Sequence, residues 1–178
     1  LRTISGFMEL RLVESGKISV DMGVPSFSPR DIPFLSDQAL ERYSLKLSNS
    51  NIDVGVVSIG NPHVVQIVNN IDLAPVEATG PEIEHHDLLP EGANAGFFEI
   101  VNRNSIKIRV WERGAGETLA CGSGACAAAA IGIMWGLLTS PVDIETKGGK
   151  LSIEWSGLGR NIIKTGPARI IFDGKIQV

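Results

Sequence analysis

The run of small and apolar residues from Ala125 to Leu138 constrains the fold more than any other stretch of this sequence. Its first six residues are alanine or cysteine, and the segment from Ile131 onward is apolar on nearly every side. A helix without a polar face is buried all round. We therefore predict a central helix over about residues 122–138, wrapped by strands.

A glycine-rich turn precedes this run and places Cys121 at the start of the predicted helix, in the order Cys121-Gly122-Ser123-Gly124. The first amides of a helix lack partners within it, and the helix dipole makes that end electropositive. We therefore expect a lowered pKa for the Cys121 thiol. The amides of Gly122 and Ser123 could receive a carboxylate. The alternative is a buried structural cysteine at a tight helix start.

Composition excludes several classes of protein. The net charge is −4 and no run of Lys or Arg stands out, which argues against a nucleic-acid or membrane-surface role. No apolar run is long enough to span a membrane, and the N-terminus lacks the pattern of a signal peptide. With 43% hydrophobic residues, the chain can bury a sizeable core.

The two cysteines cannot act as a facing pair. Cys121 and Cys126 are five residues apart, so on one helix they are too distant for a disulfide and cannot approach one substrate from opposite sides. We expect Cys126 to be a small core residue. Two reduced cysteines in an acidic chain favour a cytoplasmic location.

Alternating and turn-forming residues predict an α+β fold, in which a curved mixed sheet or barrel closes on the central helix. A short helix is expected near Pro75, with a break at Gly80-Pro81. We expect a hairpin within residues 1–22, followed by strands at 42–47, 52–59, 64–68, 97–101, 106–111, 142–146, 150–155, 161–164 and 168–173.

Chemically useful side chains stand at the ends of these elements: Asn61, His63, Asn94, Glu112, Arg113 and Cys121. If they converge, the guanidinium can grip a carboxylate and the amides can serve both an ammonium and a carboxylate. Such a site would suit a zwitterionic amino acid. Each has an ordinary alternative. Asn61 and His63 could be turn residues, with the histidine fully hydrogen-bonded. Asn94 could be a loop residue, and Glu112 and Arg113 a surface ion pair. His85 and His86 have no neighbours at metal-ligand spacing, so we predict no metal site.

Taken together, five motifs resemble the diaminopimelate epimerase family over essentially the whole chain. They are VDMGVPSF (20–27), GNPH (60–63), PEGANAGF (90–97), ERGAGETLACGSGACAA (112–128) and GPARIIFDGKI (166–176). The resemblance implies interconversion of LL- and meso-diaminopimelate, for lysine and cell-wall synthesis. It implies no cofactor, neither pyridoxal phosphate nor a metal. Two cysteines would face each other across the α-carbon, one removing a proton and the other delivering one.

The resemblance also implies residue roles. Cys121 would be one of the two catalytic cysteines, with His63 and Glu112 keeping the thiols in workable protonation states. The distal end of the substrate would be held by Asn61, Asn94, Glu112 and Arg113. The amides of Gly122 and Ser123 would take the α-carboxylate, as their place at the helix start also suggests. Serine stands at 123 where the family would have threonine, which is conservative because the backbone amide carries the role.

The other catalytic cysteine of the family has no counterpart motif here. On this resemblance we expect residues 1–21 and 167–178 to be remnant strands of an N-terminal domain, and residues 22–166 to form the catalytic domain. The expected partners are the substrate and the absent N-terminal half, with a homodimer as a further option. Because inversion needs an acid and a base on opposite faces, we expect these 178 residues alone to be inactive.

Three alternatives stay open. The first is another cofactor-independent racemase of this fold, such as the proline racemase or PhzF-like families. The Glu112-Arg113 pair with Asn61 and Asn94 argues for a substrate with a second polar end, which proline lacks. The second is a cysteine hydrolase that uses Cys121 and the histidine at 63. The third is a catalytically silent module.

Overall fold

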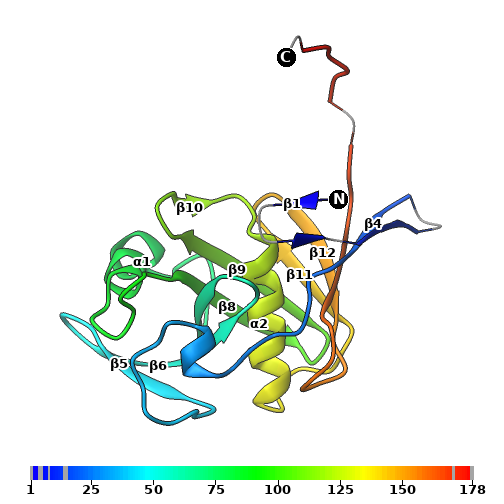
Figure 1. The fold of residues 1–178 in the computed structure, drawn as a ribbon. Helices are drawn as coiled ribbons and strands as arrows, with labels where there is room; N and C mark the ends of the chain where they lie inside the picture. Colours follow the sequence, from blue (N-terminus) through cyan, green and yellow to red (C-terminus); the bar gives the residue numbers. More distant parts are fainter. Residues whose placement is uncertain (1, 4–5, 8, 14–15, 170, 177–178) are drawn as a thin grey trace.

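Helix α2 (Gly122–Met134) passes through the middle of the molecule, with strands on its sides (Figure 1). The computed structural model describes residues 2–3, 6–7, 9–13, 16–169 and 171–176. Within these ranges the chain forms an eleven-stranded mixed sheet, a separate two-stranded sheet, two α-helices and one 3-10 turn.

The other elements follow in chain order: β1 (Arg2–Thr3), β2 (Gly6–Phe7), β3 (Leu10–Leu12), β4 (Ile18–Asp21), η1 (Pro29–Asp31), β5 (Tyr43–Lys46), β6 (Asn51–Ser58), β7 (Pro62–Ile67), α1 (Val76–Glu84), β8 (Asn94–Asn102), β9 (Ser105–Glu112), β10 (Gly116–Thr118), β11 (Val142–Thr146), β12 (Gly149–Glu154) and β13 (Ile163–Gly166). The large sheet has the order β3-β4-β13-β12-β11-β9-β8-β7-β6-β5, with β10 paired to β9. The pairs β7–β8 and β9–β11 are parallel, and the other pairs are antiparallel.

Alternate residues of the central strands enter two different cores. Phe98 packs in the core around α2, whereas its neighbour Phe97 packs in the core under α1. Both rings are fully buried. This alternation follows from the two-residue period of a strand. It also decides which polar residues at the strand ends face α2.

The central helix is buried as predicted, but it ends short of residue 138. The amide of Gly136 donates to the Ile133 carbonyl oxygen, and the amide of Leu137 donates to that of Gly132. Gly136 has a φ of +69°. These two bonds and the left-handed glycine form a Schellman motif, which ends a helix whatever the polarity of the residues that follow.

Helix α1 confirms the helix expected near Pro75, but the break expected at Gly80-Pro81 is wrong. Pro81 lies inside the helix, which continues to Glu84. The proline removes one helical hydrogen bond. Burial of Val76 and Ile83 on the core side of α1 holds the helix together across that position.

The strand predictions are mostly confirmed, with three corrections. β7 begins at Pro62 and β8 at Asn94, so two expected turn or loop segments belong to strands. No strand is present at 168–169 or 171–173, because that segment has no strand beside it and extends away from the body (Figure 1). The expected N-terminal hairpin is present as β3 and β4, while residues 1, 4–5, 8 and 14–15 lie outside the described ranges.

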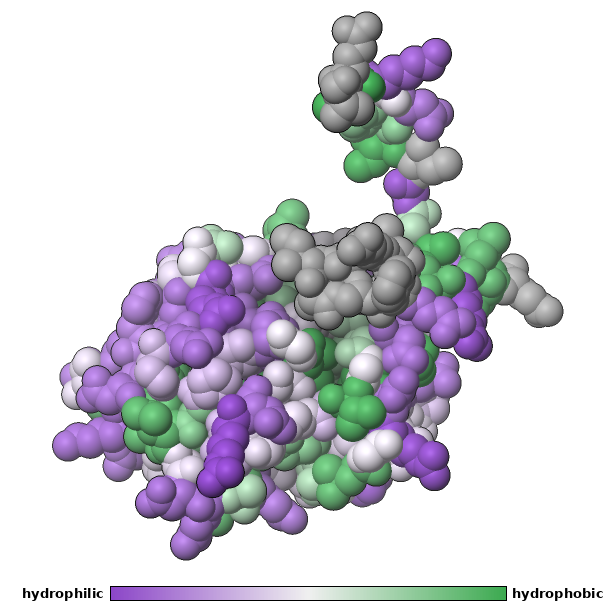
Figure 2. Space-filling view, in the orientation of Figure 1, coloured by the Kyte–Doolittle hydropathy of each residue, from purple (hydrophilic) through white to green (hydrophobic). Residues whose placement is uncertain are grey.

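Several apolar side chains are exposed near the C-terminal segment. Ile171, Phe172 and Ile176 are each more than four-fifths exposed, and Figure 2 shows apolar residues on this segment and beside its exit from the body. In the part of the chain described here, no helix is long and apolar enough to cross a membrane.

The tight seat of α2 on β6 generates a stability prediction. A Cβ atom added at Gly55 would lie 2.5–2.9 Å from three side-chain carbons of Ile131. We expect Gly55→Ala to lower the free energy of unfolding by about 1–3 kcal/mol through overpacking. The control is Gly96→Ala, whose Cβ would make ordinary 3.5 Å contacts with Val65. Urea unfolding should separate the two variants, and equal stability would contradict this packing.

Candidate active site

Three of the predicted site residues lie in one row across neighbouring strands. His63 pairs with Asn94 between β7 and β8. Ala95 pairs with Trp111 between β8 and β9, so the next residue in that ladder beside Asn94 is Glu112. Strands β7 and β8 therefore begin where β9 ends. By strand alternation this row lies on the face of the sheet that covers α2.

Cys121 occupies the N-cap of α2 beside this row, so the predicted helix start is right. Its side chain is buried, and Sγ lies 3.6 Å from the Ser123 hydroxyl oxygen. The lowered pKa expected for this thiol is wrong. Burial raises the pKa of Cys121, and the nearby Glu112 carboxylate raises it further; hydrogen bonds from Ser123 and Gly124 oppose this only in part. Loss of hydration outweighs the favourable helix end.

Cys126 is the buried core residue that the sequence predicted. It is fully buried within α2, and burial raises the pKa of its thiol to about 12. Both cysteines are free. Cys126 is therefore an inert packing group one helical turn and a half beyond Cys121.

His63 is a fully buried, neutral histidine. Its Nε2 lies 3.1 Å from the Asn61 amide oxygen, which can only accept, so Nε2 carries the ring proton. Nδ1 is then an acceptor, and it has no partner among the described residues. Burial, followed by the positive charge of Arg113, lowers the pKa of His63 to about 3. The ring is therefore not a structural histidine with both nitrogens hydrogen-bonded within the described part of the chain.

Asn94 connects the strands of the row. Its Nδ2 donates to the Pro62 carbonyl oxygen at 2.9 Å, and its Oδ1 accepts the Arg113 backbone amide at 3.0 Å. The side chain is buried at the start of β8, which the loop interpretation of this residue did not allow. One N–H and one lone pair of the amide stay free for a ligand.

Glu112 and Arg113 point to different partners. Glu112 Oε1 accepts the Thr118 hydroxyl at 2.5 Å across the β9–β10 hairpin. The exposed Arg113 guanidinium donates to the carbonyl oxygens of Glu91 and Gly92 at 2.7 and 3.3 Å. No ion pair joins Glu112 to Arg113 among the residues described. Arg113 is the only predicted site residue that lines an open hollow of about 500 Å³, which lies beside the end of α1 and the loop that follows it.

Sequence reasoning missed three residues here. Thr118 binds Glu112, the Glu84 carboxylate binds the hairpin beside Arg113, and Lys164 reaches the start of α2. A Cβ at Gly122 would lie 2.5 Å from Lys164 Nζ. The glycine-rich hairpin at 112–118 was a usable signal for Thr118. The other two come from distant elements, and nothing local pointed to them.

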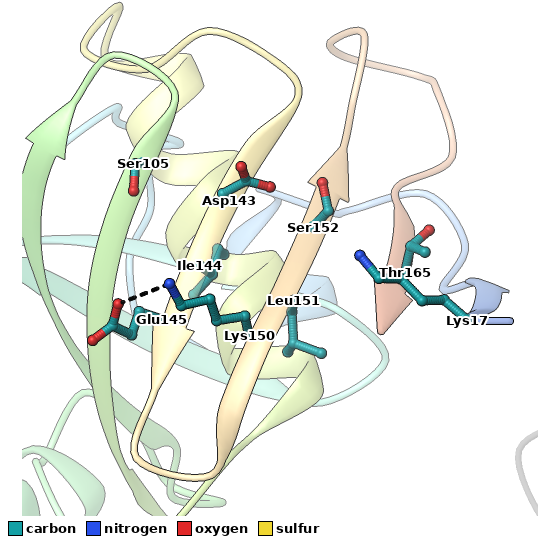
Figure 3. A pocket seen from close by; sticks show the side chains of 9 residues that line it. All are labelled: Lys17, Ser105, Asp143, Ile144, Glu145, Lys150, Leu151, Ser152 and Thr165. Atoms are coloured by element: carbon teal, nitrogen blue, oxygen red, sulfur yellow. Dashed lines mark ion pairs between the residues drawn. The ribbon is translucent and has the colours of Figure 1, made fainter. Parts of the chain in front are cut away.

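A second hollow lies on the outer face of the sheet, and none of the predicted site residues lines it. Figure 3 shows Asp143, Glu145 and Lys150 around this space of about 280 Å³, with α2 behind the strands. Glu145 and Lys150 form an ion pair at 3.6 Å. Because Ile144 packs against α2, its neighbours in β11 face away from Cys121.

Sequence comparisons identify relatives of the whole chain. A family model described as diaminopimelate epimerase matches residues 55–171. The chain belongs to the diaminopimelate epimerase family. It is 49% identical to the diaminopimelate epimerase of Chromobacterium violaceum and 48% identical to that of Nitrosomonas eutropha, over all 178 residues. The chain spans 64% of the length of each of these relatives.

Solved structures agree on the fold. A hydroxyproline epimerase from Agrobacterium vitis matches 92% of this chain and 55% of its own, with a TM-score of 0.62 and 16% identity. A probable proline racemase from Agrobacterium radiobacter matches 95% and 58%, with a TM-score of 0.61 and 15% identity. At this identity the likeness concerns the fold alone, and it confirms the predicted α+β class.

The surroundings of Cys121 predict how its thiol titrates. Because the Glu112 carboxylate raises the pKa of Cys121, Glu112→Gln should move the thiol's titration to lower pH. The pH dependence of alkylation, followed by peptide mass spectrometry to separate Cys121 from Cys126, measures this. Glu145→Gln on the outer face is the control. An unchanged or upward-shifted Cys121 profile would contradict the assignment that Glu112 raises the pKa of the thiol.

The buried histidine predicts acid-sensitive stability. The pKa of His63 is about 3 in the fold against 6.5 for the free side chain, so between these values the unfolded chain binds more protons. Stability therefore falls as pH drops below 6.5, by at most about 1.4 kcal/mol per pH unit for this group. In His63→Gln the free energy of unfolding should therefore change less between pH 6.5 and about pH 5, an interval above the pH at which carboxylates titrate. Exposed His85→Gln is the control, and the same slope in both variants would contradict the assignment.

Proposed function

We propose that this chain forms one side of the active site of a diaminopimelate epimerase, with Cys121 exchanging a proton with the α-carbon of the substrate. The observation that carries the proposal is the position of the Cys121 thiol. It stands at the first turn of α2, where the Glu112 carboxylate raises its pKa. The thiol also lies beside the row that contains His63 and Asn94. Family membership supplies the substrate class.

In the proposed reaction the α-carboxylate binds the amides of Gly122 and Ser123 at the start of α2. Loss of the α-proton leaves an electron pair that delocalises into this carboxylate, and the helix end stabilises the added negative charge. Burial keeps Cys121 protonated before the reaction. A base on the opposite face takes the α-proton while Cys121 gives its own proton to the near face, which inverts the carbon.

The products of this step are a thiolate at Cys121 and a protonated base on the other face. The reverse reaction, or proton exchange with solvent, restores the starting state. Glu112 acts on the protonation of the thiol through its charge. We propose that His63 also acts on it, through its free Nδ1 acceptor. These steps use protein side chains alone and call for neither pyridoxal phosphate nor a metal.

The distal amino-acid end of the substrate would lie toward Arg113. The hollow beside Arg113 is lined by this residue, by the end of α1 and by the loop that follows α1. Asn61 and Asn94 do not line this hollow, and we propose that their amides bind the same end of the substrate, because an amide can serve both an ammonium and a carboxylate. A substrate with one polar end would leave this guanidinium bonded only to the carbonyl oxygens of Glu91 and Gly92, without an anionic partner.

The second base must come from elsewhere, because Cys126 is buried in the core. We propose that residues outside these 178 supply it and that the 178 residues alone do not epimerise. On this view residues 1–21 and 167–178 belong to the domain that carries the second base, and 22–166 to the Cys121 domain. A homodimer is a further option. A role in lysine and cell-wall precursor synthesis would place the protein in the cytoplasm.

Exchange of the α-proton of diaminopimelate in heavy water tests the proposal in the protein at the length its source cell makes. Cys121→Ser should slow exchange by roughly 10²–10⁴-fold, because a serine hydroxyl replaces the acid–base group. Cys126→Ala should leave exchange near its original rate. Unchanged exchange in Cys121→Ser would overturn the proposal, and an acyl-enzyme burst with an ester would favour a cysteine hydrolase. Epimerisation by the 178 residues alone would overturn the proposal that the second base comes from outside them.

A further inference from the structure

Glu84 is a buried carboxylate that none of the proposed steps uses. It is the last residue of α1 and only 6% exposed. A buried carboxylate is costly unless hydrogen bonds or a cation satisfy it. Among the described residues no Lys or Arg pairs with Glu84, and the side chain of His85, which lies 3.9 Å away, is mostly exposed. Its partners are instead two neutral N–H groups.

Both donors come from one hairpin and bracket the Glu112-Arg113 pair. The indole Nε1 of Trp111 donates to Oε2 of Glu84 at 2.6 Å, and the backbone amide of Gly114 donates to Oε1 at 2.7 Å. One carboxylate therefore binds the residue before the pair and the residue after it.

Asn94 secures the same turn from the opposite strand. Its Oδ1 accepts the Arg113 backbone amide. Consecutive backbone amides of the turn, Arg113 and Gly114, are thus bound by two different buried side chains. The path of the chain through Glu112 and Arg113 depends on both acceptors.

Close packing prevents α1 from adjusting to a different side chain at this position. A Cβ at Gly80 would lie 2.5–2.9 Å from Trp111 side-chain atoms. A Cβ at Gly92 would lie 3.1 Å from both the Arg113 Cδ and the Glu84 carbonyl oxygen. The distance from α1 to the hairpin is therefore set by contact of the Gly80 backbone with the Trp111 side chain, and the length of the glutamate side chain spans it.

We propose that Glu84 is a positioning residue, which holds the hairpin so that Glu112 faces Cys121 and Arg113 faces the distal end of the substrate. It acts through the backbone of the turn and does not contact substrate. The effect of Glu84 on catalysis rests on the proposed function, whereas its effect on the geometry of the hairpin does not.

Glu84→Gln keeps the shape but turns one acceptor into a donor, so one of the two hydrogen bonds is lost. In the full-length protein we expect KM for diaminopimelate to rise roughly tenfold, the range for a lost bond to a charged group, with a smaller change in kcat. The matched control is Glu82→Gln, on the same helix. Glu82 also accepts a backbone amide, that of Ser48 at 2.8 Å, but lies away from the hairpin. This control should leave KM unchanged.

A double-mutant cycle separates positioning from a general loss of stability. If Glu84 acts through Arg113, adding Glu84→Gln to Arg113→Met should raise KM little further. The proposal would be overturned if the double variant raised KM by the product of the two separate effects. It would also be overturned if Glu84→Gln lowered only the thermal stability.

Amide hydrogen exchange distinguishes failure of this inference from failure of the proposed function. If the unaltered protein does not exchange the α-proton of diaminopimelate, the proposed function fails. The role of Glu84 is then decided by NMR on the same variants. Glu84→Gln should accelerate exchange at Gly114 and at Ala115, whose amide closes the turn onto the Glu112 carbonyl oxygen at 3.0 Å. Glu82→Gln should not, and equal protection of Gly114 in both variants would overturn the positioning role.

Discussion

Enclosure of α2 by the sheet is the constraint on which the rest of the structure depends. The helix has no polar face, and Gly124 through Gly132 are buried throughout. Such a helix is stable only when strands cover it on several sides. Its four free N-terminal amides must then emerge where the sheet ends, because burying them without partners would be costly. Cys121 and the ends of β7, β8 and β9 meet at that edge for this reason.

The same enclosure decides the electrostatics of the site. A helix start favours a thiolate, but a thiol packed against apolar strands loses the hydration that a thiolate needs. At Cys121 the loss of hydration is larger, so the thiol is neutral in this state. His63 is kept neutral by the same burial. The thiol of Cys121 and the imidazole of His63 are therefore both uncharged, and the nearby carboxylate of Glu112 belongs to the β9 hairpin.

Local pattern was enough to predict the elements, but not how they meet. Six consecutive small residues predicted α2, and alternation predicted most strands. The end of α2 was missed because Trp135 and Leu137 extend the apolar run, although Gly136 had already ended the helix. The row in the site depends on parallel pairing of β7 with β8, whose partners His63 and Asn94 are separated by a helix and two loops. A pairing at that separation leaves no periodic signal, so convergence of the site stayed a conditional prediction.

Buried polar residues mark where sequence reasoning ends and structure begins to inform function. Glu84 stands in an acidic stretch, EIEHH, that reads as a solvated helix end. Only the tertiary structure shows that its carboxylate is buried against Trp111 and Gly114. Retaining a charge in an interior position costs stability unless each oxygen has a donor. Here both donors belong to the hairpin that presents Glu112 and Arg113, so the cost is offset where the orientation of those side chains matters most. An apolar residue at 84 would leave the Gly114 amide and the Trp111 indole without these acceptors, and the turn would lose its link to α1.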